Sequence, residues 1–187
     1  MITGLVLVYL SASASFLLAQ EADDDFQKNY VVISSHYIKA VEIAHSNTNY
    51  DYFIGTIAYQ RMIEKGWGIR LGIQPLIWAR SNFEGLDSTA GMGTNIGWVG
   101  YFGSQDYPVF YVDFDIGGML FNEDVPVEGA KKFNWSLGAG GGMEFPVSKN
   151  HSMFFGYRYS HISNSNTGTR NPGVNGHSLV FGIRYKL

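Results

Sequence analysis

The sequence predicts an all-β protein, an eight-stranded antiparallel transmembrane β-barrel of the outer-membrane type, and three observations lead to that prediction. The first is a series of segments in which apolar and polar residues alternate, as they do when successive side chains of a strand point to opposite faces. The second is the chemistry of the two faces, because one is aromatic and the other carries glycine and charge. The third is the alternation of short and long connections between the predicted strands along the chain.

Eight segments between turn-forming residues have the composition of strands. Their predicted ranges are 30–38, 51–63, 66–79, 90–102, 108–121, 132–146, 151–163 and 177–187. Most of these lengths suit strands that cross a bilayer at a tilt and close into a barrel with a filled interior. No long unbroken apolar segment follows the N-terminal region, so a crossing by helices is not predicted.

The alternation is clearest in the second half of the chain. The even positions of 108–121 and the odd positions of 132–146 and 177–187 are largely apolar, and the opposite positions are small or charged. In the third segment the apolar face is expected to consist of Trp67, Ile69, Leu71, Ile73 and Ile77.

The two faces decide between a membrane barrel and a soluble one. A soluble barrel would turn its apolar side inward, whereas here the polar side is the one with small residues and opposite charges, which suits a narrow polar lumen. The charges expected to pair there are Asp113, Asp115 and Glu144 with Arg70, Arg158 and Arg184. The aromatic side then faces lipid.

The connections give the orientation. Those at 64–66, 103–106 and 147–150 are short, whereas 39–50, 80–89, 122–131 and 164–176 are longer. Short turns belong on the periplasmic side of such barrels and long loops outside, so both termini are expected in the periplasm.

Composition narrows the function classes. The chain has 187 residues, no Cys, a net charge of −3 and 16% charged residues, against about 25% in soluble domains. Nucleic-acid binding is not expected without a basic cluster, and disulfides and thiolate metal sites are excluded. Residues 2–19 are apolar and uncharged and an acidic stretch follows, so we expect a signal peptide over 1–19 and one barrel domain over 20–187.

One strand carries candidate chemistry on its apolar face. In 151–163 that face runs through Met153, Phe155, Tyr157 and Tyr159 into His161 and Ser163. An imidazole beside a hydroxyl can act as the general base for a serine nucleophile, and Asn175 falls on the matching parity at the start of the last strand. The alternative is an ordinary extracellular loop of Asn, Gly and Thr after the strand.

The string from Tyr157 to Asn166, followed by Asn171-Pro172-Gly173-Val174-Asn175, resembles the His-x-Ser-Asn signature of the PagL-type lipid A 3-O-deacylases and their acyloxyacyl hydrolase relatives. These are eight-stranded outer-membrane barrels that cleave an ester-linked acyl chain from lipopolysaccharide with a Ser-His-Glu triad on the barrel exterior. The resemblance implies that His161 is the base, Ser163 the nucleophile and Asn164 the residue tied to the oxyanion hole.

Two positions depart from that pattern. The family's triad Glu falls on Asn175, and Asn166 stands where a small Gly is expected beside the oxyanion hole. An amide can orient a histidine through its carbonyl oxygen but cannot stabilise an imidazolium by charge. Activity is then expected to be lower, unless a loop carboxylate substitutes; the candidates are Glu123, Asp124 and Glu128.

The sequence thus favours an outer-membrane serine esterase that acts on lipid A, at the 3-O position, in the outer leaflet. No metal or organic cofactor is expected; the expected partners are lipopolysaccharide and outer-membrane lipids, and a homodimer is compatible with the sequence. Two alternatives stay open, a non-catalytic structural or binding barrel and a phospholipase-type barrel.

Overall fold

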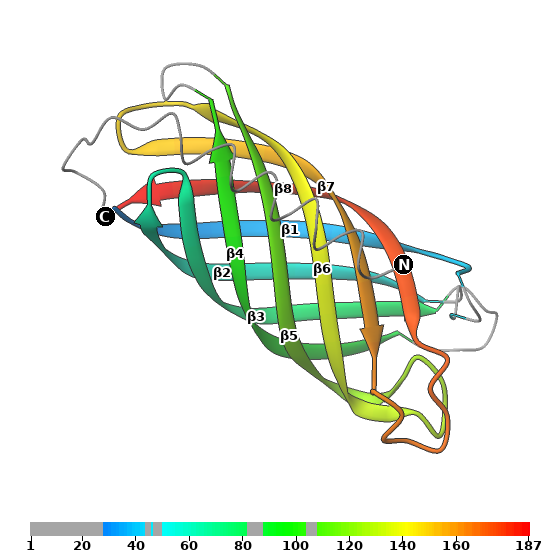
Figure 1. Ribbon diagram of the computed structural model, residues 1–187. Coiled ribbons are helices and arrows are strands. Elements are labelled where there is room, and N and C mark those ends of the chain that lie inside the picture. The colour runs from blue at the N-terminus through cyan, green and yellow to red at the C-terminus, as the bar shows by residue number, and fades with distance from the viewer. Residues whose placement is uncertain (1–27, 44–45, 47–49, 82–87, 104–107) are drawn as a thin grey trace.

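The computed structural model describes residues 28–43, 46, 50–81, 88–103 and 108–187. The signal peptide expected over 1–19 lies outside them. The described part of the chain forms a closed barrel in which each strand pairs antiparallel with its sequence neighbours and β1 pairs with β8 (Figure 1). The strands are β1 (Asn29–Val41), β2 (Tyr50–Glu64), β3 (Trp67–Ser81), β4 (Thr89–Phe102), β5 (Val109–Val125), β6 (Lys131–Pro146), β7 (His151–Ser163) and β8 (Val174–Lys186). Among these residues no helix has the length and apolarity needed to cross a membrane.

The predicted fold class, strand order and pairing are confirmed. Strand β7 has the predicted bounds, whereas β8 begins three residues earlier and β5 continues to Val125. The connection between β5 and β6 is therefore the turn 126–130, not a loop over 122–131, and it contains Gly129 with a φ of 78°. Glu123 and Asp124, which we expected in a loop, belong to β5.

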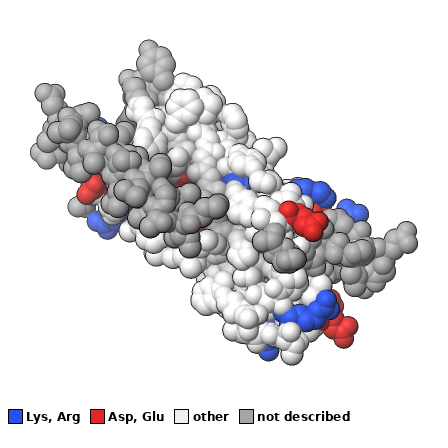
Figure 2. All heavy atoms as spheres, turned by 45° about the vertical axis from the view of Figure 1, so that its right-hand side comes forward, with Lys and Arg blue, Asp and Glu red and all other residues white. Residues whose placement is uncertain are grey.

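The barrel wall has the predicted two faces. Leu137, Phe155 and Phe181 are 43%, 52% and 50% exposed on the outside, whereas Arg158 is buried. In Figure 2 the charged side chains gather toward the two ends of the barrel, and most of the surface between them is uncharged. An apolar band of this kind is what a barrel presents to lipid.

Opposite charges pair inside the lumen, as predicted. Arg158 binds Asp113 at 3.0 Å and Asp115 at 2.6 Å, and Arg70 lies 3.5 Å from Asp113. Arg184 pairs with Glu144 in the same way. Buried charges persist only when they are paired and hydrogen-bonded. The ion pairs of Arg158 therefore tie the C-terminal half of β7 to β5 from the inside.

One predicted orientation is wrong. Ile77 was expected on the lipid-facing side of β3 but is fully buried, whereas Trp78 is 46% exposed. The pairing of β3 with β4 shifts register between Gln74 and Ile77. Pro75 in this interval has no N–H to donate to the ladder, and a bulge exchanges the two faces beyond it.

Candidate active site on the barrel exterior

The C-terminal end of β7 and the N-terminal end of β8 bring two of the predicted site residues together. His161 and Asn175 are direct partners in the antiparallel register, so their side chains stand side by side on the exterior. The imidazole Nδ1 of His161 lies 2.8 Å from the Asn175 side-chain oxygen Oδ1. This is the contact that a histidine base and its orienting residue require.

The orientation of the Asn175 amide follows from its other contact. Its Nδ2 donates to the backbone carbonyl of Ile43, just beyond the end of β1, at 3.2 Å. A carbonyl only accepts, so the amide nitrogen must face Ile43 and the amide oxygen must face His161. Nδ1 of His161 therefore carries the proton that is donated to Asn175, and in the neutral imidazole Nε2 is the nitrogen with the lone pair.

The Asn175 oxygen has a second donor that the sequence reasoning missed. The Tyr159 hydroxyl donates to it at 2.7 Å. Tyr159 shares the outward parity of His161 in β7, and that parity is the sequence signal that could have drawn attention to it.

Ser163 lies at the end of β7 on the same face, and both it and His161 are half-buried. Among the described contacts of His161, the hydrogen bond is to Asn175 and none is to Ser163. Both side chains nevertheless lie close to one point, the position that a Cβ would take on Gly173. A Cβ added there would lie 3.3 Å from His161 Cε1 and 3.8 Å from Ser163 Cβ.

Gly173 is thus a further site residue, and its φ of 61° favours glycine for a second reason. The Asn-Pro-Gly turn sequence signals such a backbone, but the contact with His161 depends on how the turn folds back over β7.

Asn164 organises the turn after the candidate nucleophile. It is 2% exposed; its Oδ1 accepts from the Asn166 N–H at 3.0 Å and its Nδ2 donates to the Arg170 carbonyl at 2.8 Å. Its own N–H donates to Asn171 Oδ1 at 3.2 Å. Asn166 has a φ of 65°, a conformation for which Asn is the best substitute for glycine. The expected Asn164 and Asn166 are therefore both structural parts of this turn.

The turn between β5 and β6 is hydrogen-bonded to the loop between β7 and β8. The Gly129 carbonyl accepts from the Thr169 hydroxyl at 2.7 Å and from the Arg170 N–H at 3.1 Å. Asp124, one of the candidate substitute carboxylates, accepts from the Gly129 N–H at 3.3 Å. Glu123 and Glu128 are exposed. The described partner of His161 Nδ1 is Asn175, not one of these three carboxylates.

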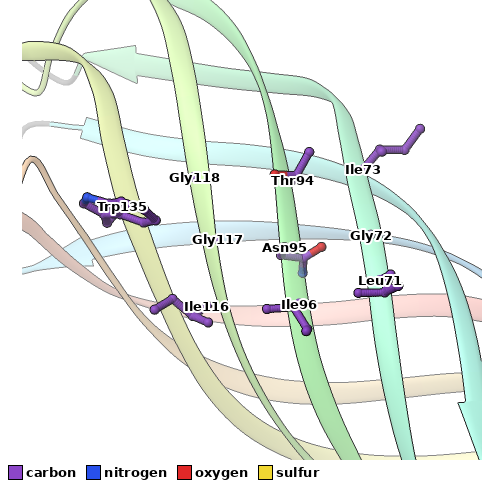
Figure 3. A pocket seen from close by; sticks show the side chains of 10 residues that line it. All are labelled: Leu71, Gly72, Ile73, Thr94, Asn95, Ile96, Ile116, Gly117, Gly118 and Trp135. Carbon is purple, nitrogen blue, oxygen red and sulfur yellow. The ribbon is translucent and has the colours of Figure 1, made fainter.

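An apolar groove of about 500 Å³ lies on the exterior beside the site. Its long axis follows one row of paired residues, which begins at Ser163 and crosses the barrel wall through Trp135, Gly118, Thr94 and Ile73. Glycine and threonine in the middle of the row leave a hollow. Figure 3 shows this row above a second one of Ile116, Ile96 and Leu71, which forms the other wall.

The groove has the dimensions of a single lipid chain. It extends over the four strands from β6 to β3, which are separated by three spacings or about 14 Å. The hydrocarbon part of one leaflet, which is half of the core, is about 15 Å thick. The row thus offers an acyl-sized groove whose near end, at Trp135, is paired with Ser163.

Comparison with solved structures agrees with the architecture. Neisserial surface protein A is 17% identical with a TM-score of 0.63, and 85% of this chain and 97% of that chain are covered. The outer-membrane enzyme PagL is 13% identical with a TM-score of 0.59, covering 81% and 97%. The outer-membrane protein OprG from Pseudomonas aeruginosa is 11% identical with a TM-score of 0.52, covering 86% and 96%. At these identities the likeness concerns the fold.

The sequence comparison is more specific. No curated protein sequence matches the chain. A family model described as lipid A 3-O-deacylase (PagL) matches residues 61–184, which is more than half of the chain and includes the strands and loop that carry His161, Ser163 and Asn175. The protein is therefore a bacterial outer-membrane β-barrel that belongs to the lipid A 3-O-deacylase (PagL) family.

Proposed function

We propose that this barrel is a serine esterase that removes an ester-linked acyl chain, the 3-O chain, from lipid A in the outer leaflet. The observation that carries the proposal is the 2.8 Å contact between His161 Nδ1 and Asn175 Oδ1, on the exterior and beside Ser163. In the neutral imidazole this contact directs the lone pair to Nε2, on a histidine that shares its strand face with a serine hydroxyl. The family match supports lipid A as the substrate.

In the proposed reaction the Ser163 hydroxyl attacks the ester carbonyl carbon while His161 Nε2 takes its proton. The tetrahedral intermediate collapses when the bond to the sugar oxygen breaks and His161 returns the proton to that oxygen. Water then attacks the acyl-serine with His161 again as base, which releases the fatty acid and restores Ser163. Asn175 keeps the imidazole in the required tautomer throughout.

The oxyanion needs donors close to Ser163. We assign this role to the turn that Asn164 organises, because the left-handed residues Ser165 (φ 52°) and Asn166 (φ 65°) begin two residues after the nucleophile. Asn164 would act by holding this backbone in shape, since its own N–H is bound to Asn171. Its side-chain Nδ2 has a second hydrogen besides the one donated to Arg170.

The exterior groove supports a lipid as the substrate. An acyl chain that lies between Trp135 and Leu71 would remain in contact with apolar side chains while its ester is at Ser163. The longer loops, including 164–173, would then be extracellular and the site would lie at the outer leaflet. All three of His161, Ser163 and Asn175 come from one chain, so a homodimer is not needed to complete the triad.

A second candidate is a non-catalytic barrel, which the uncharged Asn175 in the triad position favours. A third is an esterase for phospholipids, because the groove specifies an acyl chain and not a headgroup.

Mass spectrometry of lipids from cells that express the protein separates the three. We expect lipid A to lose one acyl chain in the parent and in the lumen-side control Ser160→Ala, but not in Ser163→Ala. Unmodified lipid A with new lysophospholipid would favour the third candidate. Unmodified lipids throughout, with a folded barrel in the membrane, would leave the second.

A further inference from the structure

Two tyrosines on the outer face of β7 make equivalent contacts with β8. Tyr157 pairs with Leu179 in the register, and its hydroxyl contacts Nδ1 of His177, two residues earlier in β8. Tyr159 pairs with His177, and its hydroxyl reaches Asn175, again two residues earlier. The two contacts have the same offset in the strand register, but only the Tyr159 hydroxyl contacts the residue that is hydrogen-bonded to His161.

Asn175 depends on such contacts more than a carboxylate would. A carboxylate attracts an imidazolium over several ångströms, whereas a neutral amide holds His161 through a hydrogen bond that weakens steeply with distance and angle. The position of its oxygen must therefore be fixed by its surroundings. The Ile43 carbonyl holds the nitrogen end at 3.2 Å, and the Tyr159 hydroxyl holds the oxygen end at 2.7 Å.

We propose that Tyr159 is a positioning residue of the active site, which anchors the Asn175 side-chain oxygen so that a neutral amide can keep His161 in its Nδ1–H tautomer. The inference rests on the proposed esterase function only for its kinetic consequence. Its structural consequence, the tautomer of His161, is independent of any substrate.

The test compares Tyr159→Phe with the matched control Tyr157→Phe. Each variant loses one hydroxyl from the same face of β7 and keeps the ring, so both are expected to remain heat-modifiable barrels. Hydrolysis of purified lipid A in detergent micelles should show kcat lowered about fivefold in Tyr159→Phe, the effect of one neutral hydrogen bond. KM should stay within about twofold, and Tyr157→Phe should keep the parent kcat.

Nitrogen-15 NMR of the histidine side chains gives the second readout, with the His161 signals assigned by their loss in His161→Gln. We expect one Nδ1–H tautomer in the parent and in Tyr157→Phe, and a mixture of tautomers in Tyr159→Phe. Parent kcat together with a single tautomer in Tyr159→Phe would overturn the proposal. Equal losses in both tyrosine variants would also overturn it, because they would indicate a general effect of interfacial hydroxyls.

Failure of the esterase function has a different signature. If the parent hydrolyses neither lipid A nor phospholipid, there is no rate to compare between the variants. The tautomer of His161 in the two variants then decides whether Tyr159 positions Asn175.

Discussion

Replacing Asn175 by alanine removes the side chain that forms the described hydrogen bond with His161. Three hydrogen bonds end on it: those from His161 Nδ1 and Tyr159, and the one to Ile43. In the proposed reaction the bond from His161 has the largest effect on the rate, because the imidazole would become charged in the transition state.

A hydrogen bond to a charged group contributes about 1.5–3 kcal/mol, and each ~1.4 kcal/mol is tenfold in rate. We therefore expect Asn175→Ala to lower kcat roughly tenfold to hundredfold for lipid A hydrolysis in micelles, followed by release of free fatty acid. The barrel should remain heat-modifiable, because the change lies outside the lumen network. Stability in urea should fall by no more than about 1 kcal/mol.

Asn175→Asp is the matched control, because it keeps an oxygen where His161 and Tyr159 donate. It adds a charge that stabilises the imidazolium, but it also places an acceptor oxygen in front of the Ile43 carbonyl oxygen, and the two repel each other. These effects oppose each other, so hydrolysis should stay within about tenfold of the parent. Parent-like activity in Asn175→Ala would refute the role of Asn175, and the carboxylates of β5 and its turn would then have to be tested.

Three further outcomes follow from the structure. Gly118→Leu fills the middle of the groove and should reduce hydrolysis of long-chain esters far more than hydrolysis of short-chain esters. Met92 is exposed but does not line the groove, so the control Met92→Leu should not discriminate by chain length. Gly173→Ala forces a side chain into a left-handed backbone 3.3 Å from His161 Cε1, so it should cost about 1 kcal/mol of stability and most of the activity, as thermal unfolding and kinetics would reveal. Arg158→Met leaves two buried carboxylates without their main partner and should destabilise the barrel by about 3–5 kcal/mol in urea titrations; a loss below about 1 kcal/mol would contradict the ion-pair assignment.

The alternation of residues was sufficient to predict the barrel, because membrane and lumen impose opposite chemistry on the two faces of every strand. It failed at Ile77, where one bulge beside Pro75 exchanges the faces. The alternation of apolar and polar residues does not reveal an extra residue in a strand. The resulting exchange of the two faces is visible only in the strand pairing. The end of β5 shows the same limit, since acidic Glu123 and Asp124 look like loop residues but continue the hairpin.

Parity likewise placed His161 and Asn175 on one face, and the register made them direct partners. Parity could not predict the contacts that other segments of the chain make with these two residues. The Ile43 carbonyl comes from the other side of the barrel seam, where β1 meets β8, and its contact with Asn175 joins segments 132 residues apart. Gly173 reaches His161 only because its turn folds back over β7.

The Ile43 carbonyl also bears on why an amide is compatible with a position where the family pattern has a carboxylate. A carboxylate at Asn175 would place two acceptors face to face, whereas the amide offers a donor to Ile43 and an acceptor to His161 at once. The tautomer of His161 is thereby set by the segment just after β1, and in the proposed reaction the missing negative charge would affect only the imidazolium. The residue at 175 and the backbone at 43 therefore form one unit, and a carboxylate at 175 should reach its full effect only if the Ile43 carbonyl turns away.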